Sequence, residues 1–183
     1  MKLRELIKII ETKYPLYLKE KWDNIGLMIG DLDKEVTKDS KSRKVVKTVT
    51  KVIHKDKSET YEQEETVYDS ENKEIKKTIN SVTKDPEDKV LDSRVYQLNE
   101  DGSSSDYHYV LNDDGSETET NENKSVDGTE EKITETKDKN KVVIVSKKSV
   151  KKADGSTSDY SYTLNDDETY TEENTVTDAE EHT

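Results

Sequence analysis

Hydrophobic side chains are unevenly distributed along the chain, and the change in their density separates a short head from a long polar tail. Residues 1–36 contain 17 apolar side chains, whereas the 147 residues of segment 37–183 contain 34. Val, Ile and Leu together make up only 24 of those 147 residues, which is below the roughly 20% that marks disorder-prone, highly charged sequences. We therefore expect no compact core in the tail, because little apolar area is available to offset the entropy of ordering it.

The head carries the pattern of one amphipathic helix. Over residues 2–13, apolar side chains fall on one helix face, at Leu3, Leu6, Ile7 and Ile10. Pro15 ends this helix, and Gly26 then marks a loop that enters a short strand at Leu27–Ile29. Because the apolar helix face needs a partner surface, we expect it to contact another protein or a second copy of the chain.

The tail contains an internal repeat. Residues 101–114 read DGSSSDYHYVLNDD and residues 154–167 read DGSTSDYSYTLNDD, which agree at 11 of 14 positions at an offset of 53 residues. A period near 50 is typical of arrays of supersecondary units. Apolar side chains alternate in each copy, at Tyr107, Tyr109 and Leu111 and at Tyr160, Tyr162 and Leu164. This alternation predicts one strand face per trio and the same local structure for both copies.

Asp-Gly pairs punctuate the tail and predict tight hairpin turns. They lie at residues 101–102, 114–115, 127–128 and 154–155. Val142–Val145 is the densest apolar run of the tail and is flanked by lysines, which is typical of a protected edge strand. These patterns favour antiparallel hairpins, and a mostly disordered tail stays open as the alternative.

The expected fold class is mainly β. Repeated antiparallel hairpins form an elongated, partly disordered tail, and one short N-terminal α-helix precedes them. The expected parts are a head at 1–36, a polar linker or degenerate repeat at 37–93, a hairpin repeat at 94–140, and a hairpin repeat with an acidic C-terminal part at 141–183.

Charge narrows the range of partners and compartments. The net charge of -13 lies in the tail, where 36 acidic residues exceed 23 basic ones, so we expect neither nucleic acid nor a membrane as partner. Cysteine is absent, which excludes disulfides and thiolate zinc sites. Charged residues such as Arg4 and Lys8 interrupt any signal-peptide core. The expected location is cytoplasmic, and an extracellular origin of the tail stays open.

The segment Trp22–Asp31, WDNIGLMIGD, follows the amphipathic helix and Pro15. With them it resembles the N-terminus of the type 2 GTP cyclohydrolase I homologue family, a group of dinuclear metal-centre proteins. The resemblance covers residues 1–36 and implies an α/β fold, toroidal hexamers, two metal ions held by histidines and carboxylates, and a hydrolase or cyclohydrolase activity. Asp23 and Asn24 match the family's motif in a loop segment, where we expect them to have a structural role.

The rest of the chain departs from that family's pattern. The family continues with a hydrophobic strand, a helix and a paired-histidine motif, whereas this chain continues with TKDSKSRKVVKTVTKV. Its histidines are His54, His108 and His182, far apart in sequence, so no metal ligand carries over. His108 is replaced by Ser161 in the second copy of the repeat, which favours a solvent-facing strand position. We expect no catalytic residue, cofactor or metal site.

The acidic turns partly resemble calcium loops, which need Asp at the first position, Asp or Asn at the third and fifth, Gly at the sixth and Glu at the twelfth. Asn112–Gly115 and Asn99–Gly102 supply part of this pattern, but their first ligands would be Val110 and Gln97. We expect these segments to be hairpin turns, with weak adventitious calcium binding as the alternative.

Two classes of function remain. The first is a non-enzymatic, acidic β-repeat protein that acts as a spacer or an interaction surface. The second is a truncated or diverged dinuclear-metal hydrolase of the family named above. The missing ligands favour the first class, and a fusion or rearranged reading frame that joins residues 1–36 to an unrelated repeat would explain the contrast in composition.

Overall fold

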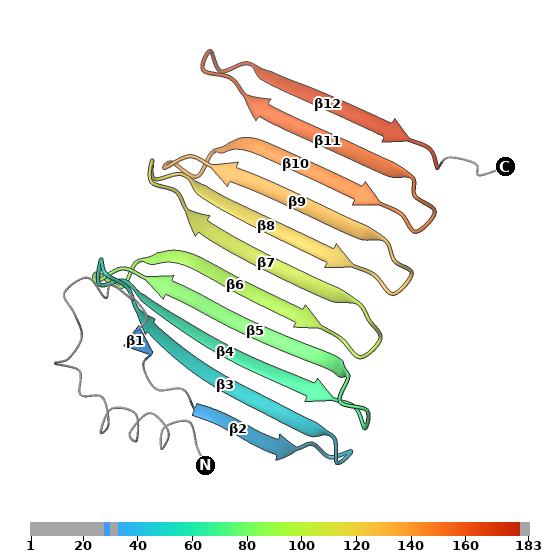
Figure 1. Ribbon diagram of the computed structural model, residues 1–183. Helices are drawn as coiled ribbons and strands as arrows, with labels where there is room; N and C mark the ends of the chain where they lie inside the picture. Colours follow the sequence, from blue (N-terminus) through green and yellow to red (C-terminus); the bar gives the residue numbers. More distant parts are fainter. Residues whose placement is uncertain (1–27, 30–32, 180–183) are drawn as a thin grey trace, which may run out of the picture.

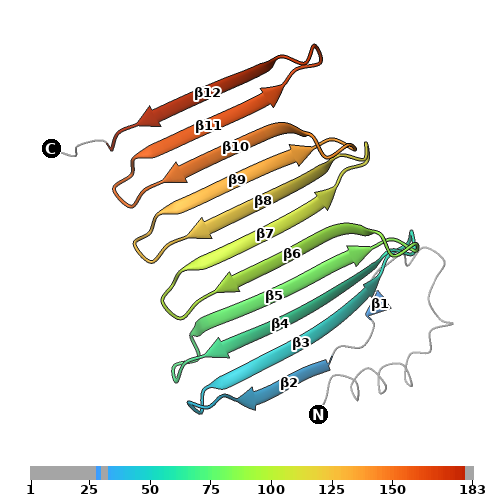
Figure 2. The same ribbon diagram turned by 180° about the vertical axis from the view of Figure 1, so that it is seen from behind.

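The computed structural model describes residues 28–29 and 33–179, which form one antiparallel sheet of twelve strands (Figure 1). The strands lie side by side in a single layer, and no other described segment covers either face (Figure 2). The strands are β1 (Met28–Ile29), β2 (Asp33–Lys38), β3 (Lys44–Ile53), β4 (Glu59–Tyr68), β5 (Glu74–Lys84), β6 (Val90–Leu98), β7 (Ser104–Leu111), β8 (Glu117–Lys124), β9 (Glu130–Lys137), β10 (Val143–Lys151), β11 (Thr157–Leu164) and β12 (Tyr170–Thr177).

The topology is a simple meander. From β3 to β12 each strand pairs with the next one in the sequence. β1 and β2 share the outer edge of β3, because β1 pairs with Val52 and Ile53 while β2 pairs with residues 44–49. The two edges of the sheet are therefore β12 at one end and β1 with β2 at the other.

All ten connections between β2 and β12 use the same five-residue turn. The first residue donates its backbone N–H to the carbonyl of the fifth, and the fourth donates to the carbonyl of the first. The fourth residue always has a positive φ, as in a hairpin turn that ends in a bulge residue. This residue is Gly at 102, 115, 128 and 155, which confirms the four predicted Asp-Gly turns.

An aspartate supports every one of these turns. Its carboxylate accepts the backbone N–H of the fifth turn residue, from the first turn position at Asp39, Asp69, Asp85 and Asp138. In the other six turns the aspartate stands at the third position, at Asp56, Asp101, Asp114, Asp127, Asp154 and Asp167. Aspartate is therefore present in all ten turns, including the six that have no glycine at the fourth position.

The sequence repeat corresponds to four strands. β7 and β11 have bounds that differ by 53 residues, as do β8 and β12. Tyr107 pairs with Asn121 and its counterpart Tyr160 pairs with Asn174, so the two copies also share their register. An even number of strands preserves both strand direction and face, which is why identical sequences occupy equivalent places.

Side chains alternate between two exposed faces because successive residues of a strand point to opposite sides. The register places six tyrosines on one face, which we call the tyrosine face: Tyr61, Tyr107, Tyr109, Tyr160, Tyr162 and Tyr170. The opposite face, the threonine face, carries one transverse row with six threonines: Thr60, Thr83, Thr118, Thr136, Thr163 and Thr171.

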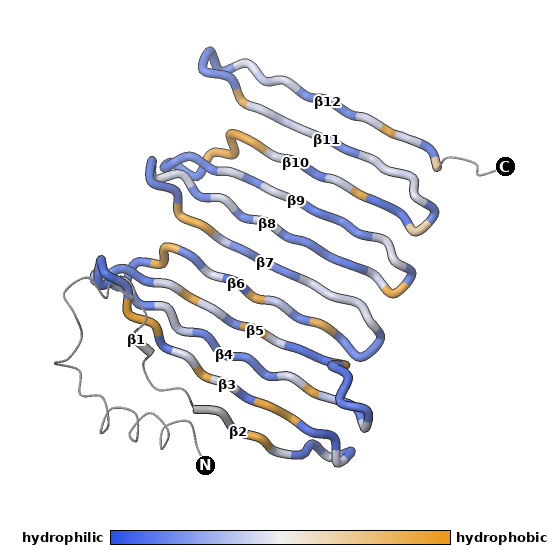
Figure 3. The backbone as a smooth tube through the Cα atoms, in the orientation of Figure 1, coloured by the Kyte–Doolittle hydropathy of each residue, from blue (hydrophilic) through white to orange (hydrophobic). Residues whose placement is uncertain are grey.

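Almost no hydrophobic core exists among the described residues. Val45 and Val67 are the buried hydrophobic side chains there, and both lie in the β3–β4 pair. Hydrophobic positions are scattered along the strands and do not gather in one layer (Figure 3). The sheet is therefore held by its backbone ladder and by cross-strand pairs, each of which contributes roughly 0.2–1 kcal/mol.

The structure corrects parts of the expected fold class. The helix predicted over residues 2–13 lies outside the described residues, and those that are described contain no helix, so the helix is not supported. Partial disorder of the tail is wrong, because residues 33–179 form one continuous sheet, within which the segment 37–93 contributes strands. Many satisfied polar pairs replace the missing apolar core.

Two shorter predictions have opposite outcomes. The strand expected at Leu27–Ile29 is present as β1. The run Val142–Val145 is not an edge strand, because β10 pairs with β9 on one side and β11 on the other. Its register shifts between Val143 and Val145, so this apolar run forms an irregular strand start inside the sheet.

Candidate interaction surface

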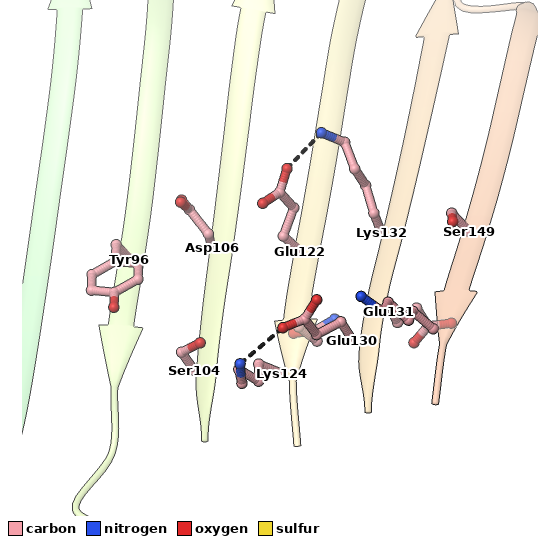
Figure 4. A pocket seen from close by; sticks show the side chains of 11 residues that line it. Tyr96, Ser104, Asp106, Glu122, Lys124, Glu130, Glu131, Lys132 and Ser149 are labelled. Atoms are coloured by element: carbon pink, nitrogen blue, oxygen red, sulfur yellow. Dashed lines mark hydrogen bonds and ion pairs between the residues drawn. The ribbon is translucent and has the colours of Figure 1, made fainter. Parts of the chain in front are cut away.

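The threonine face carries a band of charged side chains across β6 to β10. A shallow groove of about 530 Å³ lies in this band and is shown in Figure 4. Glu122 and Lys132 pair across it at 2.6 Å, and Lys124 pairs with Glu130 at 2.8 Å. Tyr96 closes one side of the groove. The groove is thus walled by ion pairs between neighbouring strands.

A second cluster adjoins this groove and consists of one ion pair and one hydrogen bond between a histidine and a carboxylate. Arg94 binds Asp106 with two guanidinium nitrogens, at 2.9 Å from Nε and 2.6 Å from a terminal nitrogen. His108 Nε2 lies 2.7 Å from Asp92 Oδ2. Opposite charges on neighbouring strands therefore pair within the band, although Asp106 and Glu122 place two carboxylates opposite each other.

The pKa shifts of the side chains in this band favour their charged forms. The hydrogen bond from Lys124 lowers the pKa of Glu130, and the same bond raises the pKa of Lys124. The hydrogen bond to Asp106 raises the pKa of Arg94. General acid–base catalysis needs pKa values near the working pH, whereas these shifts move away from neutrality. They indicate structural ion pairs.

The tyrosine face combines partly buried rings with acidic side chains. Burial raises the pKa of Tyr109 to about 12, and a hydrogen bond with Glu117 adds to the effect. Tyr162 and Tyr170 stack with ring centroids 5.8 Å apart. The Tyr160 hydroxyl donates to Glu172 at 3.0 Å. This face therefore offers aromatic contact area next to hydrogen-bond acceptors.

The structure does not bring the histidines together. His54 begins the β3–β4 turn and its Nε2 lies 2.7 Å from the Thr60 hydroxyl. His108 lies on the face opposite Tyr107 and Tyr109, as expected, with its side chain 43% exposed. His182, Asp23 and Asn24 lie outside the described residues. Within the described ranges no group of three or more His, Cys, Asp or Glu side chains could hold a metal ion.

The segments compared with calcium loops are hairpin turns. Asp114 uses its carboxylate inside its own turn, where it accepts the backbone N–H and the hydroxyl of Ser116 at 2.9 and 2.6 Å. Asp101 does the same with Ser103. These hydroxyl bonds, together with the backbone bonds, lower the pKa of both aspartates.

Sequence reasoning missed the charged band. A usable signal was present, because a fixed turn length sets which residues face each other in a hairpin. Asp106 and Glu122 fall opposite each other, and so do Glu122 and Lys132. Counting outward from each turn would have placed these charges on one face.

Comparison with known proteins identifies only the N-terminal segment. Residues 1–49 match the family model Duf34/NIF3 (NGG1p interacting factor 3), a match that ends inside β3. A stretch of 38 residues is 55% identical to a GTP cyclohydrolase 1 type 2 homolog of Clostridium perfringens (strain 13 / Type A). It covers 21% of this chain and 14% of that relative. No solved structure matches the chain.

Among the described residues, no helix is long or apolar enough to cross a membrane.

The expected resemblance of the first 36 residues is confirmed by the family model and by the clostridial relative. The N-terminal segment of the chain therefore resembles the Duf34/NIF3 family, and the remainder of the chain is not recognised.

Proposed function

We propose that this chain is a non-enzymatic β-sheet scaffold that acts as a spacer or an interaction surface. The observation that carries the proposal is the single layer, which exposes two broad faces and buries only Val45 and Val67 among the hydrophobic side chains described. Active sites are usually concave and exclude water around the reacting atoms. A one-layer sheet has no interior in which to do this.

The geometry suits an elongated spacer. The strands from β3 to β12 are separated by nine strand spacings, and each spacing is about 4.8 Å, so these two strands lie roughly 43 Å apart. The identical turns keep this spacing regular. Along that distance one face presents tyrosines and the other presents paired charges, and both suit contact with proteins.

A metal-dependent hydrolase is the second candidate, favoured by the match of residues 1–49 to Duf34/NIF3 and by the name of the clostridial relative. His54 and His108 weigh against it, since each contacts a different partner, Thr60 or Asp92. The whole relative is far longer than the matched stretch.

Two measurements on the full-length chain separate the candidates. Elemental analysis after dialysis should find far fewer than two zinc, iron or manganese ions per chain, and turnover of GTP should stay at the buffer level with each metal added. Small-angle X-ray scattering should show a flat particle with a longest dimension of at least about 50 Å. Two retained ions with metal-dependent turnover, or a compact spherical particle, would contradict the scaffold.

A further inference from the structure

The outer edge of β12 lacks three of the features that usually protect an edge strand. Among the described strands only β11 pairs with it. All eight of its residues are exposed, and it contains neither lysine nor proline and no bulge. Edge strands commonly use these devices to prevent further pairing. The opposite edge strand β2 is shorter and carries Lys38.

The internal repeat shows what fits on such an edge. β12 is the counterpart of β8, displaced by 53 residues. In the same chain β9 occupies the outer edge of β8, from the pair Glu117 with Lys137 to the pair Lys124 with Glu130. The edge of β12 that no described strand covers therefore corresponds to an edge of β8 that a lysine-bearing strand, β9, occupies.

Three ion pairs join β8 to β9. In two of them the acidic partner lies on β8, and one of these two acidic residues is kept in β12. In the third pair β8 supplies Lys124, whose counterpart in β12 is Thr177. Lys137 Nζ lies 3.1 Å from Glu119 Oε1, and Glu119 corresponds to Glu172. Lys132 pairs with Glu122, which corresponds to Thr175. The edge of β12 thus keeps the acceptor for one lysine and has lost the acceptor for the other.

The charge of a strand determines whether it can pair favourably with the outer edge of β12. Residues 154–179 contain eight acidic residues and no lysine or arginine. A second β12 would bring Glu172 and Glu173 to this edge without any lysine, so it could form no ion pair there. A strand with lysine would instead find an acceptor in Glu172, which the Tyr160 hydroxyl contacts at 3.0 Å.

We propose that the outer edge of β12 binds an extended segment of a partner protein that carries a lysine at the position of Lys137 in β9. The segment adds as a further antiparallel strand, in the register that β9 has on β8. Its backbone supplies affinity and the lysine supplies selectivity, as in other cases of strand addition. This inference rests on the proposed function, because it specifies the partner of the interaction surface.

The probe is a synthetic peptide with the sequence of residues 127–140, DGTEEKITETKDKN. Titration into the full-length, ¹⁵N-labelled chain should shift amide signals in β12 and leave those of the β1–β2 edge unchanged. A peptide with Lys137→Glu should bind about two- to fivefold more weakly, the range measured for exposed ion pairs. A peptide with Lys132→Glu is the matched control and should bind as well as the native one, because β12 has Thr175 at the position that Glu122 has in β8.

The protein variant completes a charge swap. Glu172→Lys should weaken binding of the native peptide and restore binding of the Lys137→Glu peptide, whereas Glu168→Lys in the adjacent turn should change neither. The proposal is overturned if no β12 amide shifts, if both lysine substitutions weaken binding equally, or if chains associate through β12 and exclude the peptide. These outcomes are independent of metal content and particle shape, so failure here is distinguishable from failure of the scaffold proposal.

Discussion

Replacing Lys57 with glycine should stabilise the sheet. Lys57 is the fourth residue of the β3–β4 turn and has a φ of 69°, a left-handed conformation that side chains with a Cβ disfavour. Its side chain is exposed. The structurally equivalent position in four other turns holds glycine, so the geometry accepts the substitution.

The magnitude follows from two opposing terms. Left-handed backbone costs a non-glycine residue about 1–2 kcal/mol, which glycine removes. Glycine also gains freedom in the unfolded chain, which offsets about 0.5–1 kcal/mol of that benefit. The net gain is about 0.5–1 kcal/mol, and with a urea m-value of about 2 kcal/mol/M the unfolding midpoint should rise by about 0.25–0.5 M.

Urea titration followed by circular dichroism measures this shift, and Lys55→Gly is the matched control. Lys55 belongs to the same turn but is not among the residues with positive φ, so its replacement should lower the midpoint. Gly115→Ala should lower it as well, although open space surrounds the added Cβ, because φ alone is unfavourable. If Lys57→Gly lowers the midpoint as much as Lys55→Gly does, the turn assignment is wrong.

Three further predictions concern the core, acid stability and tyrosine ionisation. Val67→Ala should cost about 1.5 kcal/mol in urea unfolding, because Val67 is only 5% exposed, whereas Val176→Ala, at a site 69% exposed, should cost less than about 0.5 kcal/mol. The bonds from Ser116 lower the pKa of Asp114 below 3.8, so their contribution is present above that pH and is lost as the pH falls. Asp114→Asn should therefore reduce the drop in urea midpoint between about pH 5 and pH 2.5, and equal drops would contradict this. In an ultraviolet titration of the tyrosines, Tyr109→Phe should remove a component with a midpoint near pH 12. The pKa of Tyr109 is raised above its usual value of 10.0, so the stabilisation linked to its protonated form is fully present below pH 10. This stabilisation is lost as the pH rises from 10 toward 12.

The alternation of tyrosines and the Asp-Gly pairs were sufficient to predict hairpins and the same local structure for both copies of the repeat. Both features act locally, through side-chain alternation and positive φ, and local rules can be read from a sequence. Six turns were not predicted, because their positive-φ residue is not glycine, as at Lys57 and Glu168. The aspartate at the first or third turn position was the better signal, since it occurs in all ten turns.

The predicted disorder failed for a different reason. Composition measures the apolar area available for a core, and the described sheet uses almost none beyond Val45 and Val67. Cross-strand pairs such as Arg94 with Asp106 stabilise the sheet instead, and they depend on register, which composition does not contain. The lysines of β10 are typical of an edge strand, yet β10 lies inside the sheet, because strand order depends on pairing and not on local composition.

The most direct test of the single-layer sheet is the distance across it. Val49 and Asn174 lie in one transverse row on the tyrosine face, nine strand spacings apart. The chain has no cysteine, so spin labels at Val49→Cys and Asn174→Cys report this pair alone. Double electron–electron resonance should give a narrow distribution near 43 Å, from about 4.8 Å per strand. A distance below about 20 Å, as in a closed barrel or a two-layer sandwich, would contradict the account.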